Sequence, residues 1–119
     1  MSVLVVDDNS DAALMLELLL TQAGYRVVTA GDEASAVAAA EAQPPDAVFL
    51  DIILPGGTGY EIGKRLCSML DRRPLLVAVT GVPDLQDDSR RAGFDHHLVK
   101  PVDPAVVLRL LADHAARLP

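Results

Sequence analysis

Near its start the chain reads Val3-Leu4-Val5-Val6-Asp7-Asp8, an unbroken apolar run that ends in two carboxylates. The run is rich in β-branched residues and lacks the alternation of a strand with one face in water. It therefore predicts a strand that is buried on both faces. Such strands occur in parallel sheets covered by helices on both sides, so the rest of the chain is expected to alternate strands with helices.

The remaining sequence follows this pattern. Four more apolar runs have the length of strands: Arg26–Ala30, Ala47–Leu50, Leu75–Val79 and the weaker His97–Val99. Stretches of helical length separate or follow them, many marked by capping or breaking residues: 9–23, 32–42, 60–70, the short polar stretch 84–92, and 103–117. Five β-α repeats predict an α/β fold, a doubly wound, five-stranded parallel sheet with right-handed crossovers.

Length and composition indicate one acidic domain over residues 1–119. Half of the residues are hydrophobic, and 17 acidic against 10 basic residues give a net charge of −7. This charge argues against binding to nucleic acid, and no apolar run is long enough to span a membrane. The start of the chain lacks the features of a secretory signal, and a lone cysteine, Cys67, is expected to be a core thiol. A cytoplasmic location is predicted.

Polar side chains follow the predicted strands where each one ends. Asp7 and Asp8 follow the first strand, Asp51 the third, Thr80 the fourth and Lys100 the fifth. Because the carboxyl ends of parallel strands share one edge of a sheet, these groups are expected to lie together. Clustered carboxylates repel one another unless a cation sits among them, and Mg²⁺ is the simplest such ion. The set predicts a magnesium-dependent phosphoryl site.

Each residue alone also has an ordinary explanation. The acidic pair could be a strand end and a helix cap, and Asp51 could precede a simple turn at Pro55-Gly56-Gly57. Thr80 could be a strand-end hydroxyl, and Lys100 could be solvated. The position of all of them at one predicted edge favours the phosphoryl site.

These motifs resemble the receiver domain of response regulators in two-component signalling, over essentially the whole chain. The resemblance rests on Asp7-Asp8, on the segment from Asp51 to Gly59 with Pro55 between them, on Thr80-Gly81 and on Lys100-Pro101. It implies a flavodoxin-like (βα)5 fold with strand order 2-1-3-4-5. It also implies a phosphoacceptor signalling domain that is not an enzyme in the usual sense.

The resemblance implies roles for individual residues. Asp51 would accept a phosphoryl group from a phosphohistidine, and Asp8, Asp51 and the backbone carbonyl of Ile53 would bind Mg²⁺ directly. Asp7 would act through a metal-bound water. Thr80 and Lys100 would contact the phosphoryl oxygens, with a cis Lys100–Pro101 bond.

The sequence departs from the family at His97, three positions before Lys100, where many receivers carry an aromatic switch residue. We predict that His97 fills the switch role with Thr80, with a possible sensitivity to pH; the alternative is a surface histidine beside His96. The segment from Thr80 to Gly93 is short, which predicts a short or shifted fourth helix. Ile53 and Val82 flank the expected path of water to the acyl phosphate, and as apolar residues they predict slow self-dephosphorylation.

Partners follow from the resemblance and from the first helix, which is apolar almost all round. A histidine kinase or a histidine phosphotransfer domain is expected to dock near this helix. The segment 93–104 resembles receivers of hybrid histidine kinases, and the end at Pro119 is consistent with a stand-alone receiver or an excised piece. The alternative function is a protein-interaction scaffold of the same fold that never takes phosphate. A haloacid-dehalogenase-type phosphotransferase is disfavoured because its second acid is replaced here by Ile53.

Overall fold

The computed structural model describes residues 1–54, 57–82 and 84–118. Its main sheet has five parallel strands in the spatial order β2-β1-β3-β6-β7. These are β1 (Ser2–Val6), β2 (Arg26–Ala30), β3 (Ala47–Asp51), β6 (Leu75–Thr80) and β7 (His96–Val99). Counted along the chain, the five strands have the order 2-1-3-4-5, so the predicted topology is confirmed.

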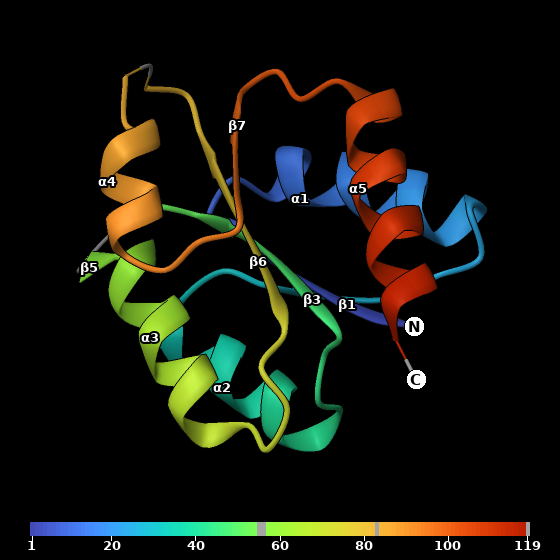
Figure 1. Ribbon diagram of the computed structural model, residues 1–119, viewed down its shortest axis with the longest axis horizontal. Helices are drawn as coiled ribbons and strands as arrows, with labels where there is room; N and C mark the ends of the chain where they lie inside the picture. The colour runs from blue at the N-terminus through green and yellow to red at the C-terminus, as the bar shows by residue number, and fades with distance from the viewer. Residues whose placement is uncertain (55–56, 83, 119) are drawn as a thin grey trace.

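Five helices cover the sheet on both faces: α1 (Ser10–Gln22), α2 (Glu33–Ala42), α3 (Gly59–Met69), α4 (Gln86–Arg91) and α5 (Pro104–Arg117). Figure 1 shows α1 and α5 together on one side of the sheet and α2, α3 and α4 on the other. Three predicted caps are confirmed, because the side chains of Asn9, Asp32 and Asp103 each accept a backbone N–H in the first turn of their helix.

The core consists of two apolar layers separated by the sheet. Along β3 every residue is buried, and successive side chains point to opposite faces. Val48 and Leu50 pack in the layer under α2 and α3, whereas Ala47 and Phe49 pack in the layer under α1 and α5. The unbroken apolar runs of the sequence are thus explained by burial on both sides.

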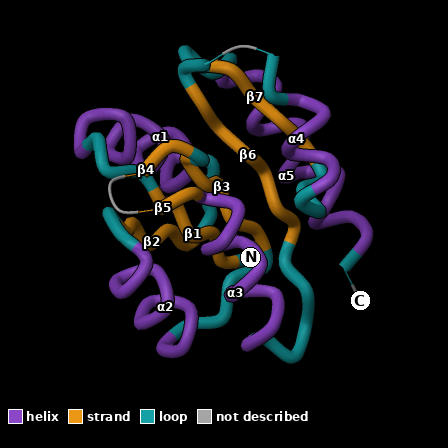
Figure 2. Tube along the Cα trace, turned by 90° about the vertical axis from the view of Figure 1, so that its left-hand side faces the viewer, coloured by secondary structure: helices purple, strands orange, loops and turns teal. Residues whose placement is uncertain are grey.

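Two features differ from the simple β-α pattern. A small antiparallel hairpin of β4 (Ile53–Leu54) and β5 (Gly57–Thr58) follows β3, and the sequence analysis did not predict it. The hairpin is the pair of short segments labelled β4 and β5 in Figure 2. The fourth helix has only six residues, as the short segment after Thr80 predicted. Pro55, Gly56, Pro83 and Pro119 lie outside the described residues.

None of the helices in the described parts of the chain combines the length and the apolar character needed to cross a membrane.

Candidate functional site

The carboxyl ends of four neighbouring strands hold the polar groups of the candidate site. Asp7 follows β1, Asp51 is the last residue of β3, Thr80 is the last residue of β6, and Lys100 follows β7. Three of these polar residues are buried among the apolar side chains of their strands: Asp7, Asp51 and Thr80. The parallel register of the sheet therefore brings together groups that are far apart in sequence.

The Lys100 ammonium joins two of the carboxylates. Its Nζ donates to Oδ2 of Asp7 at 2.7 Å and to Oδ2 of Asp51 at 3.2 Å. These partners lie 93 and 49 positions away along the chain. The Lys100–Pro101 peptide bond is cis, as the resemblance predicted. The cation thus lies between two buried carboxylates, and its charge offsets the free-energy cost of removing them from water.

Backbone groups hold the other oxygen of each carboxylate. The N–H of Asn9 donates to Oδ1 of Asp7 at 2.9 Å, and the N–H of Ile53 donates to Oδ1 of Asp51 at 3.0 Å. Both bonds span two residues, so each carboxylate is oriented by the turn that directly follows its strand. These two bonds come from the backbone and do not involve Lys100.

Asp8 completes a set of three carboxylates. One carboxylate oxygen from each of Asp7, Asp8 and Asp51 lies within 4.8 Å of the others, and Asp8 is the exposed member. Hard oxygen ligands at this spacing fit a divalent cation such as Mg²⁺, which binds oxygen at about 2 Å and retains several waters. The chemistry of the donor set therefore fits the predicted metal. The carbonyl of Ile53 stays a predicted ligand.

Burial and charge shift the ionisation of the central pair. Burial raises the pKa of Asp51 above its ordinary value, although the Ile53 N–H and Lys100 act in the opposite direction. For Lys100, burial lowers the pKa, but the hydrogen bonds and charges of Asp7 and Asp51 outweigh it and raise the pKa overall. Lys100 therefore remains a cation throughout the neutral range.

The Thr80 hydroxyl lies at the same strand ends and is fully buried. Its Oγ1 accepts the backbone N–H of Val82 at 3.1 Å, and its carbonyl accepts the backbone N–H of Lys100 at 2.7 Å. A hydroxyl that accepts one bond can still donate its proton to a third group. Thr80 is thus a potential donor next to the carboxylates.

His97 lies on the same side of the sheet as Thr80 and is half-buried, whereas His96 is exposed. Its Nδ1 lies 2.7 Å from Oγ of Ser89 in α4, which in turn lies 3.0 Å from the Tyr60 hydroxyl in α3. Burial lowers the pKa of His97. His97 was predicted as a functional residue, whereas Ser89 and Tyr60 were not, because their only signal in the sequence is their presence in segments of helical length.

The two apolar residues beside the site are exposed. Ile53 is 53% exposed and Val82 is 42% exposed. Neither can orient a water molecule by a hydrogen bond, because an alkyl side chain has no donor or acceptor.

An apolar groove of about 660 Å³ begins at the site and runs along α1. Lys100, Pro101 and Val102 form one wall and the apolar side chains of α1 the other. Met15 and Leu18 are largely exposed on this helix, so part of its apolar surface is uncovered.

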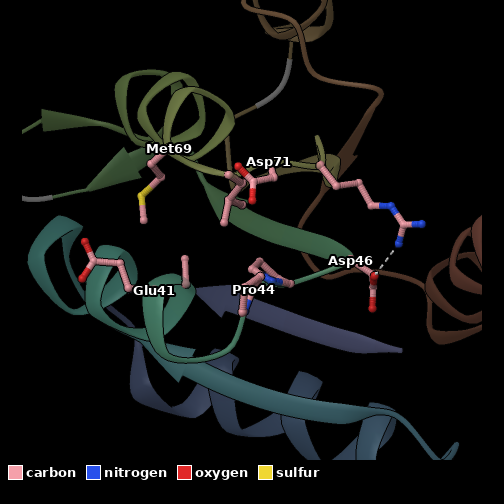
Figure 3. A pocket seen from close by; sticks show the side chains of 9 residues that line it. Glu41, Pro44, Asp46, Met69 and Asp71 are labelled. Carbon is pink, nitrogen blue, oxygen red and sulfur yellow. Dashed lines mark ion pairs between the residues drawn. The ribbon is translucent and has the colours of Figure 1, made fainter.

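A second groove lies at the opposite edge of the sheet, near the amino ends of β3 and β6. Figure 3 shows Glu41 and Pro44 on one side of this groove, Met69 and Asp71 on the other, and Asp46 at one end. Asp46 pairs with Arg72 at 3.7 Å and accepts the backbone N–H of Ser2 at 2.8 Å. These contacts join the loops before β3 and β6 to the start of β1, at the opposite edge of the sheet from the carboxylates of the candidate site.

Cys67 packs against the core layer under α3. Burial raises the pKa of its thiol, so the reactive thiolate is disfavoured at neutral pH, in agreement with the predicted core thiol.

Three comparisons relate the chain to known proteins. A sequence model of the family described as "Response regulator receiver domain" matches residues 3–112. The chain is 40% identical over 114 residues to "Probable transcriptional regulatory protein TcrX" of Mycobacterium tuberculosis, covering 93% of this chain and 48% of TcrX. It is 29% identical over 112 residues to Protein PilH of Pseudomonas aeruginosa, covering 92% of this chain and 93% of PilH.

Among solved structures, a two-component response regulator from Clostridium difficile matches with a TM-score of 0.90, over 98% of this chain and 97% of that chain. Its 22% identity supports the fold alone. The chain thus spans about half the length of TcrX and nearly all of PilH.

Proposed function

The chain belongs to the receiver domain family of response regulators, and from this premise we propose that residues 1–119 form one phosphoacceptor domain that takes a phosphoryl group from a phosphohistidine onto Asp51. The observation that carries the proposal is the contact of one ammonium, that of Lys100, with the buried carboxylates of both Asp7 and Asp51. A protein that served only as a scaffold would have no need to bury like charges in this way. We also propose a cytoplasmic location and no binding of nucleic acid, in view of the net charge of −7.

In the proposed reaction an oxygen of Asp51 attacks phosphorus, and the bond between phosphorus and the imidazole nitrogen breaks. The electron pair goes to the imidazole, which takes a proton from solvent, and Asp51 becomes an acyl phosphate. Asp8, Asp51 and the Ile53 carbonyl would hold a Mg²⁺ ion directly and Asp7 through a water, and the bound ion would supply charge neutralisation for the phosphoryl oxygens. Lys100 and Thr80 contribute a cation and a hydroxyl donor to the same oxygens.

The test is the incubation of the purified chain with Mg²⁺ and a small acyl phosphate or phosphoramidate. Intact-mass measurement is expected to show one added phosphoryl group, and a chelator of Mg²⁺ should prevent the addition. A chain that binds Mg²⁺ but gains no phosphoryl group from any such donor would favour the scaffold instead.

A histidine kinase or a histidine phosphotransfer domain is the proposed partner. The exposed apolar residues of α1 border the groove that leads to Lys100, so a helix carrying the donor histidine could cover Met15 and Leu18 and reach the site. Mapping of such a partner by NMR shift changes should place its contacts on α1. Contacts confined to α2 would contradict this docking. Attachment to a hybrid kinase stays a prediction.

The acyl phosphate is expected to be long-lived. Ile53 and Val82 offer no hydrogen bond to an attacking water, so the phosphoryl group in the purified chain should persist far beyond seconds. An Ile53→Asn variant, which can orient water, should lose it about tenfold faster. Leu18→Asn, an equivalent change at an exposed position on α1, should not alter the rate measured by intact mass. A half-life of seconds in the unaltered chain would refute the prediction.

Removal of the Lys100 charge is expected to strengthen binding of Mg²⁺. Lys100 occupies one oxygen of Asp7 and one of Asp51, and it repels an arriving cation. A Lys100→Met variant should therefore bind Mg²⁺ about tenfold more tightly, measured by calorimetric titration, while phosphoryl uptake falls. Lys64, the only other lysine of the sequence, is exposed on α3, so Lys64→Met is the matched control. Weaker Mg²⁺ binding in Lys100→Met would show that the ammonium and the metal do not compete.

A further inference from the structure

Three side chains from three different elements beside β6 are linked one after another by hydrogen bonds. The Tyr60 hydroxyl of α3 lies 3.0 Å from Oγ of Ser89, and Ser89 of α4 lies 2.7 Å from Nδ1 of His97 in β7. Ser89 is 1% exposed and is the buried residue of α4. This series therefore ties the short helix to both its neighbours through one buried hydroxyl.

The helix α4 depends on such ties. It has six residues, no side-chain cap, and is preceded by Asp84 with a positive φ of 68°. A helix of this length is not stable by its own hydrogen bonds. Leu85 and Ala92 at its two ends add apolar contacts to the core layer under α3. Loss of the contact between Ser89 and His97 would remove the polar link of the helix to the sheet.

The other ring nitrogen of His97 makes this link sensitive to protons. Within the described parts of the chain, Nε2 of His97 is buried and has no hydrogen-bond partner. A neutral ring with its proton on Nδ1 donates to Ser89, whose hydroxyl can then donate to Tyr60, and Nε2 carries only a lone pair. A second proton would place an N–H and a positive charge at Nε2 with no acceptor, which is unfavourable in a buried position. The protonated ring must turn towards water and leave Ser89.

We propose that Tyr60, Ser89 and His97 form a proton-operated latch that holds α4 against the sheet while His97 is neutral and releases the helix when His97 is protonated. The latch does not use Asp51, Mg²⁺ or a phosphoryl group. A negative test of the latch would therefore leave the proposed phosphoacceptor function intact, and a failure of that function would leave the latch intact.

The surroundings of the His97 ring support the proposal that protonation releases α4. Tyr60 is the titratable group that faces it, through Ser89. The charged side chains of α3 and α4, the two helices that supply Tyr60 and Ser89, are exposed: Glu61, Lys64 and Arg65 on α3, and Asp87, Asp88, Arg90 and Arg91 on α4. Those of α4 pair with one another. The adjacent strand β6 carries no titratable residue.

Burial lowers the pKa of His97 below its ordinary value. The released or unfolded state then binds the proton more readily than the latched state. The latch is consequently complete at pH values above the ordinary histidine pKa of about 6.5, and it weakens as the pH falls below that value.

The test is amide hydrogen exchange of residues 86–91 in the full chain between pH 5.5 and 8, corrected for intrinsic exchange. Protection of α4 is expected to fall about tenfold at the acid end, which lies about one pH unit below the ordinary histidine pKa, while α2 keeps its protection. His97→Asn retains a group that can bond to Ser89 but cannot be protonated, so its α4 should stay protected at every pH. Ser89→Ala should show low protection at every pH.

His96→Asn is the matched control, because His96 is exposed beside His97 and should leave the pH dependence intact. The latch is refuted if α4 of His97→Asn loses protection on acidification as the unaltered chain does, or if acid affects α4 no more than α2. If Ser89→Ala does not fold, the comparison of His97→Asn with His96→Asn is enough to show whether His97 causes the pH dependence of α4.

Discussion

Replacement of Asp51 by asparagine is expected to abolish phosphoryl uptake from a small phosphodonor in the presence of Mg²⁺. An amide oxygen is a far weaker nucleophile than a carboxylate, so no acyl phosphate can form at this position. The backbone N–H of Ile53 can still bond to the amide oxygen, as it does to Oδ1 of Asp51, so the local geometry should survive. Intact-mass measurement should show one phosphoryl group on the unaltered chain and none on the variant.

The fold of this variant is expected to be as stable as that of the unaltered chain or more so. Because burial raises the pKa of Asp51, its ionised form is less favourable in the folded chain than in the unfolded chain, and a neutral amide removes that cost. A thermal melt therefore shows whether the loss of phosphoryl uptake comes from the missing carboxylate or from unfolding of the variant. The exposed Asp71 offers the control Asp71→Asn, which should still gain one phosphoryl group. Uptake by Asp51→Asn would place the acceptor on another residue.

The second large effect is expected at Gly59, the first residue of α3. A Cβ at this position would overlap the carbonyl oxygen of Asp51 and would come within 2.7 Å of Cα of Ile52. The Gly59 N–H also bonds to the Ile52 carbonyl at 3.0 Å, so the start of α3 lies directly on the end of β3. Both partners are backbone atoms and cannot move aside without displacing Asp51.

Gly59→Ala should lower the free energy of unfolding by about 3 kcal/mol and the melting temperature by about 10 °C. Phosphoryl uptake by the remaining folded chain should fall as well, because the turn that orients Asp51 is displaced. Gly31→Ala is the matched control, since a Cβ there would lie 3.9 Å from the Asp7 carbonyl oxygen, an ordinary contact. Equal melting temperatures for the two variants would show that β3 and α3 can separate without loss of packing.

The fold was readily predicted because the three central strands β1, β3 and β6 are buried on both faces. The strand limits of β1, β2, β3 and β6 agree with the apolar runs to within one residue, and three caps mark the starts of helices. The hairpin of β4 and β5 was missed because each strand has only two residues, too few to show any alternation. The short α4 was anticipated from the length of its segment, and its limits, Gln86–Arg91, lie within the predicted stretch 84–92.

The sequence by itself determined the alternation of elements, the parallel sheet and the edge at which Asp7, Asp8, Asp51, Thr80 and Lys100 would meet. These follow from local patterns, since apolar runs mark strands and a parallel sheet gathers their carboxyl ends. Only the tertiary structure decided that Lys100 bonds to both buried carboxylates and that Ser89 joins His97 to Tyr60. Such contacts depend on the register of strands and the packing of helices onto them, which arise between segments far apart in the chain and leave no periodic signal along it.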